Sequence, residues 1–143
     1  MIKKTILPLT FIATLFFTAC ATNTAKNSTK ADVSLTNTYF KVLSLNHNEV
    51  EVFEREPYIQ FKADGSVKGH LGCNNFFGSY KIEDKNIAFE NIASTKMMCP
   101  NIKTEDAFTN VLQSVKTYEI KGETMIFSNT NGEEISVLKA IYF

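Results

Sequence analysis

Two cysteines, Cys73 and Cys99, are the side chains with the widest chemical range in this sequence, and Met97 and Met98 directly precede the second of them. Thiolate and thioether sulfurs are soft ligands, so this group could hold copper or another soft metal, or exchange disulfide bonds. No CxxC spacing accompanies the cysteines, which argues against a catalytic dithiol. For the methionines we expect a structural role, with one packed in the core and the other partly exposed.

Histidine, acidic and hydroxyl side chains do not form a convincing catalytic or metal-binding set. His70 precedes Cys73 in an H-x-x-C spacing, and residues an odd number apart on a strand face opposite sides, so if both lie in a strand they cannot easily share a metal. We expect His70 and His47 to be surface residues. The acidic residues lack a Gly- and Asp-rich calcium loop, and no Ser stands in a G-x-S-x-G turn. The sequence therefore predicts a protein that is not an enzyme and uses no metal or cofactor.

Composition and charge narrow the class of protein further. The chain has 143 residues, which favours one domain, and its 15 Lys and Arg balance its 15 Asp and Glu. A nucleic-acid-binding protein usually carries a basic face, so we expect no nucleic-acid partner. The 12 Phe and the absence of Trp indicate that aromatic side chains serve mainly in a core.

The N-terminus has the layout of an export signal. A basic start, Met-Ile-Lys-Lys, precedes an apolar run over residues 5–18 that is too short for a stable membrane-spanning helix. The run ends in Phe-Thr-Ala-Cys at residues 17–20, which is similar to a bacterial lipobox. We predict a signal peptide over 1–19 and acyl chains on Cys20, with an ordinary secretory signal as the alternative. In lipoproteins of enteric bacteria, Asp directly after the lipidated cysteine retains the protein in the inner membrane. Residue 21 is Ala, which favours the outer membrane, with the domain on its periplasmic face.

This predicted location determines the expected state of all three cysteines. The lipid on Cys20 would make the membrane a partner of the protein. Cys73 and Cys99 would lie in an oxidising compartment, where an even pair usually forms a disulfide. Such a bond would stabilise the fold by roughly 3–4 kcal/mol in the loop-entropy model. We predict a structural disulfide, with a redox or metal-binding pair as the alternative.

The elements that must position these residues follow from periodicity. Residues 20–34 are rich in Ala, Thr, Asn, Ser and Lys and are expected to form a flexible tether, with the folded domain over 35–143. Residues 46–56 read as a loop that could hold a short pairing segment. Alternation of apolar and polar residues predicts strands over 39–43, 57–63, 67–73, 76–82, 87–92, 117–121, 124–127 and 134–140.

One helix is expected from residue 102 to about 116, where apolar residues recur in steps of three and four. Thr104 is the expected N-terminal cap, and Lys116 would lie in the last turn, where a cation is favoured. About seven or eight short strands and one amphipathic helix predict an α+β fold. We expect a strongly curved, mainly antiparallel β-sheet or partial (cracked) β-barrel, with the helix packed on it.

A motif surrounds the two cysteines of the domain. Its residues are Gly72-Cys73-Asn74, Gly78, Tyr80, Thr95-Lys96-Met97-Met98-Cys99 and Glu105. In this order and spacing they resemble the META/HslJ-like domain family, whose pattern is a GCN segment, a G-x-Y strand, a T-x-M-x-C segment and a short helix that begins near an acidic residue. The resemblance covers residues 35–143. One departure is Tyr39 in the first strand, where such domains often carry Trp.

The resemblance implies a small curved sheet with one helix, in a bacterial envelope lipoprotein of a family linked to heat-shock response and novobiocin tolerance. It implies no enzymatic activity. The expected function is therefore that of a non-enzymatic envelope protein that binds another envelope protein or an apolar ligand. The alternative is a carrier or pilotin-like module that holds lipid or an apolar peptide between helix and sheet, which the Phe-rich β-region and the apolar stripe of the helix suggest.

Overall fold

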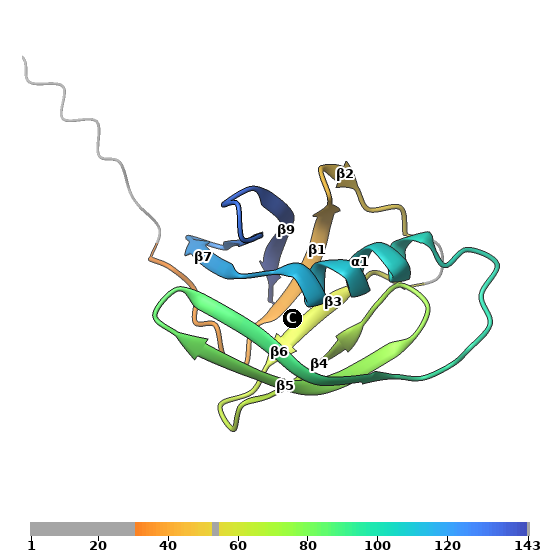
Figure 1. Ribbon diagram of the computed structural model, residues 1–143, viewed down its shortest axis with the longest axis horizontal. Helices are drawn as coiled ribbons and strands as arrows, with labels where there is room; N and C mark the ends of the chain where they lie inside the picture. The colour runs from red at the N-terminus through yellow and green to blue at the C-terminus, as the bar shows by residue number, and fades with distance from the viewer. Residues whose placement is uncertain (1–30, 53–54, 143) are drawn as a thin grey trace, which may run out of the picture.

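The computed structural model describes residues 31–52 and 55–142, so the predicted signal peptide, Cys20 and most of the predicted tether lie outside the described residues. This part of the chain contains nine strands and one helix, and all nine strands belong to one sheet (Figure 1). The elements are β1 (Tyr39–Leu45), β2 (Asn48–Glu49), β3 (Tyr58–Phe61), β4 (Ser66–His70), β5 (Asn75–Glu83), β6 (Asn86–Ser94), α1 (Lys103–Ser114), β7 (Thr117–Lys121), β8 (Thr124–Ser128) and β9 (Glu134–Ile141).

The sheet curves into a ring in which one pair of neighbouring strands, β6 and β7, shares very few residues; we call this place the narrow junction. Strands follow one another from β3 to β9, with β1 beside β3, and β1 also pairs with β9 to close the ring. All pairings between these strands are antiparallel. Between β6 and β7 the register contains only the pair Asn86 and Thr117. The predicted fold class, a strongly curved, mainly antiparallel sheet with one packed helix, is confirmed.

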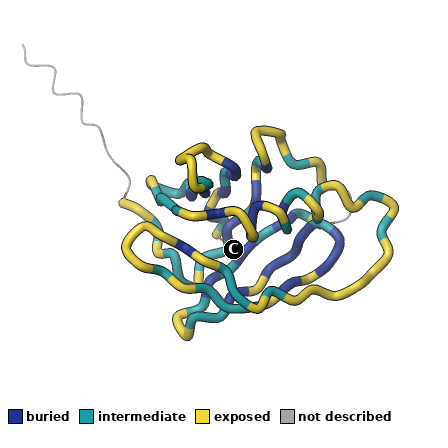
Figure 2. The backbone as a smooth tube through the Cα atoms, in the orientation of Figure 1, coloured by how far each residue is buried: buried dark blue, intermediate teal, exposed yellow. Residues whose placement is uncertain are grey.

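Alternation along the strands produces the core. In β3 the side chains of Ile59 and Phe61 are buried, while those of Tyr58 and Gln60 are only partly covered. Successive side chains on a strand face opposite sides, so the buried set lines the inside of the ring. Figure 2 shows buried positions gathered in the centre of the molecule and exposed positions in the turns around it.

Helix α1 packs its apolar stripe against this core. Phe108, Val111 and Leu112 are buried, as the sequence predicts. The ring of Phe108 meets that of Phe76 edge to face, with centroids 5.9 Å apart, an arrangement that aromatic pairs favour. Burial of one such side chain stabilises the fold by about 1.5–3 kcal/mol. No helix among the described residues has the length and apolar character needed to cross a membrane.

Both ends of the helix differ from the sequence prediction. Thr104 is not the cap, because it lies inside the helix, and the side-chain oxygen of Asn101 accepts the N–H of Lys103 at 3.0 Å. At the other end the helix stops at Ser114, so Lys116 is not in the last turn. The backbone N–H of Lys116 instead donates into the neighbouring β-structure, and this tertiary bond ends the helix earlier than the stripe predicts.

The chain joins the domain slightly before residue 35. The side-chain oxygen of Asp32 accepts the N–H of Gly122 at 2.7 Å. The N–H of Val33 donates to the carbonyl of Gly122 at 2.9 Å, and the Val33 side chain packs against the core. Residues 32 and 33 belong to the predicted tether, yet these contacts hold them to the turn between β7 and β8.

Candidate functional site

The Gly-Cys-Asn segment is a loop between β4 and β5. Strand β4 ends at His70, so the strand predicted over 67–73 is shorter than expected. Gly72 has φ of +115°, which L side chains rarely adopt, and a Cβ there would lie 3.1 Å from the Cγ2 of Thr104. Glycine therefore allows the loop to turn directly beside the start of α1.

Asn74 follows in this loop and joins three separate segments. Its side chain is buried, with 4% of the residue exposed. The side-chain oxygen accepts the hydroxyl of Thr95 at 2.8 Å and the N–H of Met97 at 2.6 Å. The side-chain amide and the backbone N–H both donate to the Glu105 carboxylate, at 3.1 Å and 2.8 Å. The loop, the connection after β6 and the first turn of α1 therefore meet at one amide side chain.

A disulfide joins Cys73 to Cys99, which confirms the predicted pairing. It links the same loop and the same connection that Asn74 links, and Cys73 is buried. Bonded sulfurs are neither thiolate nucleophiles nor thiolate ligands, so in this form the pair has a structural role.

The prediction for the two methionines is wrong, because neither is packed in the core. Met97 is 53% exposed and Met98 is fully exposed. The backbone of Met97, through both its N–H and its carbonyl, contacts Asn74, and this holds the connection at a fixed distance from the loop. The connection is therefore anchored by its main chain and by Cys99, and both methionine side chains are left at the surface.

The two histidines differ in how far they are exposed to solvent. His47 is exposed, as predicted, in the turn between β1 and β2. His70 is 2% exposed, so the prediction of a surface histidine there is wrong. Its Nδ1 accepts the N–H of Gly72 at 3.1 Å, because the chain turns back immediately after β4. Since Cys73 lies outside the strand, the alternation argument that separated it from His70 does not apply.

The remaining motif residues, Gly78 and Tyr80, position β5 against its neighbours. A Cβ on Gly78 would lie 2.6 Å from the side chain of Ile92 and 2.9 Å from the carbonyl of Glu90, so only glycine fits at this irregularity in the β5–β6 pairing. The Tyr80 hydroxyl donates to the carbonyl of Lys62 at 2.8 Å. Burial, followed by the nearby Asp64 charge, raises the pKa of Tyr80.

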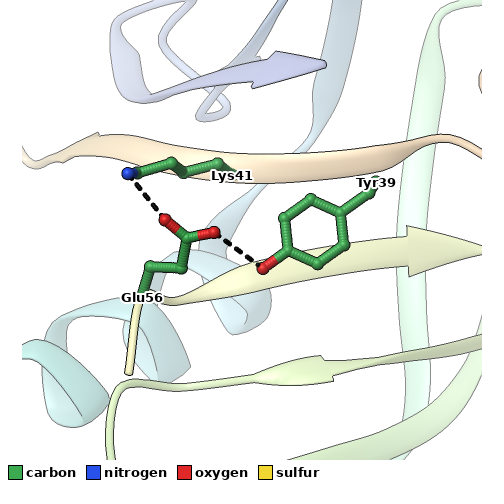
Figure 3. Close-up of polar contacts among 3 residues, drawn as sticks. All are labelled: Tyr39, Lys41 and Glu56. Atoms are coloured by element: carbon green, nitrogen blue, oxygen red, sulfur yellow. Dashed lines mark hydrogen bonds and ion pairs between the residues drawn. The ribbon is translucent and has the colours of Figure 1, made fainter. Parts of the chain in front are cut away.

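A second polar group, which sequence reasoning did not identify, lies on the outer face of the sheet. Figure 3 shows Glu56 between Tyr39 and Lys41 of β1. The Tyr39 hydroxyl donates to Glu56 at 3.1 Å, and the Lys41 ammonium lies 2.6 Å from the other carboxylate oxygen. Hydrogen bonding to Lys41 lowers the pKa of Glu56, while burial and then the bond to Glu56 raise the pKa of Tyr39. Alternation in β1 could have indicated that Tyr39 and Lys41 share a face.

Two surface hollows have side chains suited to binding. The first, of about 340 Å³, lies beside the start of α1 and is lined by Leu45, Asn46, Asn48, Glu49, Val50, Glu51, Asn101, Lys103, Thr104 and Ala107. The second, of about 320 Å³, lies beside β1 and is lined by Asn37, Thr38, Tyr39, Gln60, Ile141 and Tyr142. Nowhere in the described residues do three metal-binding side chains come together.

The fold and these contacts define a class of protein: a small domain in which one antiparallel sheet curves into a ring, one helix packs on the inner face, and a disulfide and a buried amide hold the helix to the sheet. The chain belongs to the META domain family, whose model matches residues 33–141. The Tyr39, Glu105 and disulfide contacts described above all lie within the matched residues.

Solved structures share this fold at low sequence identity. A protein from Burkholderia xenovorans matches with a TM-score of 0.63 and 18% identity, over 76% of this chain and 85% of that chain. A DUF4847 family protein from Bacteroides vulgatus matches with a TM-score of 0.56 and 12% identity, over 73% of this chain and 93% of that chain. Another protein solved by NMR matches with a TM-score of 0.60 and 19% identity, over 75% of this chain and 94% of that chain. A comparison with curated proteins finds no match.

Proposed function

We propose that this protein is a lipid-anchored envelope protein that acts by binding, without catalysis, in the response to heat shock and envelope stress, including tolerance of novobiocin. The observation that carries the proposal is a META domain over residues 33–141 behind a Phe-Thr-Ala-Cys segment at residues 17–20. The polar motif residues support a binding role rather than chemistry, because Asn74 and Glu105 bond to each other. The exposed faces remain for contact with a partner.

The stress role is tested in a deletion strain. We expect loss of the gene to increase sensitivity to heat and to novobiocin, and the full-length protein to restore tolerance. Cys20→Ala removes the acylated side chain and is expected not to restore it. A deletion strain with unchanged sensitivity to both stresses would contradict the proposed role.

Anchoring is tested separately from the stress role by labelling cells with radioactive palmitate. We expect label on the full-length protein and none on Cys20→Ala. Ala21→Asp is the matched variant, because it keeps the cysteine and is expected to shift the labelled protein from the outer to the inner membrane fraction. Label that persists in Cys20→Ala would overturn the assignment of Cys20.

The carrier alternative receives no specific support. Its motivation is the Phe-rich β-region together with the apolar stripe of the helix. Both sets pack in one core, which contains Phe40, Phe61, Phe76 and Phe127 from the strands and Phe108, Val111, Leu112 and Val115 from the stripe. Core packing explains their apolar character, so binding through the outer surface is the function that we propose.

A further inference from the structure

The proposed function assigns no role to the hollow of about 320 Å³ beside β1, whose lining residues suit a ligand. Its lining is formed by two tyrosines, one isoleucine and three residues with amide or hydroxyl side chains: Asn37, Thr38, Tyr39, Gln60, Ile141 and Tyr142. None of these side chains, all of which belong to the described part of the chain, is charged, and this favours a neutral ligand over an ion. Aromatic rings with a few polar groups of fixed position are typical of a site for a neutral ligand.

Tyr39 provides a rigid floor for this hollow. In the sheet it lies opposite Gln60 of β3 and Ile141 of β9, and paired residues of neighbouring strands project from the same face. The Tyr39 ring stacks on Tyr58, with centroids 4.2 Å apart, and its hydroxyl is bonded to Glu56 (Figure 3). A ring held in this way loses little conformational freedom when a ligand binds.

Tyr142 and two amides provide the accessible contacts. Tyr142 is 66% exposed, although it is a large aromatic residue. The side-chain amides of Asn37 and Gln60 make no hydrogen bond with other described residues, so they can bond to a ligand. Each amide offers both a donor and an acceptor, which matches a hydroxyl group that also does both.

We propose that this hollow binds a neutral saccharide. A sugar ring has an apolar C–H face, which would stack on the exposed tyrosine ring, and a rim of hydroxyl groups, which would bond to the two amides. An anionic ligand fits less well, because none of the side chains that line the hollow carries a positive charge. An acyl chain fits less well, because it would cover polar amides without bonding to them. This inference rests on the geometry of the domain alone and is independent of the proposed stress role.

The test is a titration of the ¹⁵N-labelled full-length chain, purified in a detergent that has no sugar head group. The probes are three neutral trisaccharides, namely tri-N-acetylchitotriose, maltotriose and mannotriose. We expect saturable shift changes of the backbone amides of Asn37, Tyr39 and Gln60 with at least one of them. Absence of saturable changes with all three sugars would overturn the proposal.

Two variants and a control locate the binding. Tyr142→Ala is expected to raise the Kd about 3- to 10-fold, the usual effect of one aromatic contact. Asn37→Gly removes one amide but accepts the backbone φ of +62°, so a weaker affinity would report on the amide and not on the fold. Phe77→Ala is the matched control, because Phe77 is another exposed aromatic, at 59%, outside the hollow. Equal effects of Tyr142→Ala and Phe77→Ala, or no effect of Tyr142→Ala, would also overturn the proposal.

Discussion

Asn74 makes a set of hydrogen bonds that few other side chains could make. It must accept hydrogen bonds from Met97 and Thr95 at one end and donate to Glu105 at the other, inside the protein. An aspartate at this position would have acceptors only and would face the Glu105 carboxylate, while an apolar residue would leave the N–H of Met97 without its acceptor. Asparagine is therefore the side chain that suits this position beside the disulfide, and its role there is structural.

Asn74→Asp tests this structural role of the Asn74 amide. We expect the free energy of unfolding to fall by about 2–4 kcal/mol, because a buried carboxylate would oppose Glu105 and lose two donors. The measurement is urea denaturation followed by circular dichroism. Asn75→Asp is the matched control at an exposed position and is expected to change the free energy of unfolding by less than about 0.5 kcal/mol. Equal losses in the two variants would contradict the role of Asn74.

Glu56 gives the domain a dependence on acid pH. Its hydrogen bond to Lys41 lowers its folded-state pKa below the ordinary value of 4.5. A lowered pKa means that the stabilisation is fully present above the unfolded-state pKa and is lost as the pH falls through the folded-state pKa. Both side chains of the ion pair are about one-third exposed, so we expect the contribution to be below about 1 kcal/mol.

Glu56→Gln is expected to remove this contribution. As the pH falls below the ordinary Glu pKa of 4.5, the urea midpoint of the unaltered protein should fall more steeply than that of Glu56→Gln, because the Glu56 carboxylate becomes protonated and loses its ion pair. Glu49→Gln, at an exposed position in β2, is the control and should keep the steeper fall. Identical pH profiles for Glu56→Gln and the unaltered protein would show that the ion pair does not stabilise the fold.

At the scale of elements, the connection from β6 to α1 has no regular structure of its own. Its contacts with the loop after β4 and with the start of β5 include the Asn74 hydrogen bonds, the disulfide and a backbone bond from Thr95 to Asn75 at 3.0 Å. Helix α1 begins directly after it, at Lys103. These contacts therefore determine where the helix starts above the core.

The disulfide should carry a large share of this constraint. Its cysteines are 26 residues apart, and loop-entropy reasoning gives a loss of about 3–4 kcal/mol in the free energy of unfolding when both are replaced by alanine. Urea denaturation of the Cys73→Ala, Cys99→Ala double variant measures this loss. Cys20→Ala removes the third cysteine and should leave the urea midpoint unchanged. A thiol assay that found both domain cysteines reactive without reductant would refute the bond.

Local periodicity predicts the helix and the strands well, but it predicts the burial and the distant contacts of single residues in and next to the loops poorly. The helix stripe and the β3 alternation are properties of neighbouring residues, and the structure confirms both. The burial of His70 and the exposure of Met97 depend on turns and on bonds to distant residues, so no local pattern contains them. Likewise, Asn74 and Glu105 are 31 residues apart, and only the motif resemblance indicated that they belong together.

The candidate site is less predictable than the fold for the same reason. The hollow beside β1 combines Asn37 before β1, Gln60 in β3 and Tyr142 directly after β9. Each residue is unremarkable in its own segment. Only the closure of the ring, which pairs β1 with both β3 and β9, brings them together.

For the whole molecule, the narrow junction between β6 and β7 is the expected point of opening. Two backbone bonds cross it outside the strand ladders, from Ile87 to Lys116 at 2.9 Å and from Tyr118 to Lys85 at 3.0 Å. We expect the amides of Ile87 and Tyr118 to exchange with solvent faster than those of the longer β8–β9 ladder, since local opening breaks fewer contacts there. Native-state hydrogen exchange measures this difference. Equal protection at both places would mean that the ring opens only by global unfolding.

Pairing of β1 with β9 also restricts when the protein can fold. Tyr39 lies opposite Ile141, so the contact that closes the ring joins residues 102 positions apart in a chain of 143. Such long-range contacts slow folding, because the entropy of a long loop is lost before the contact forms. During synthesis, β9 becomes available for this pairing only after the other eight described strands have been made. The ring of strands therefore closes only after β9 has emerged, although β1, which it pairs with, is the first strand of the sheet to be made.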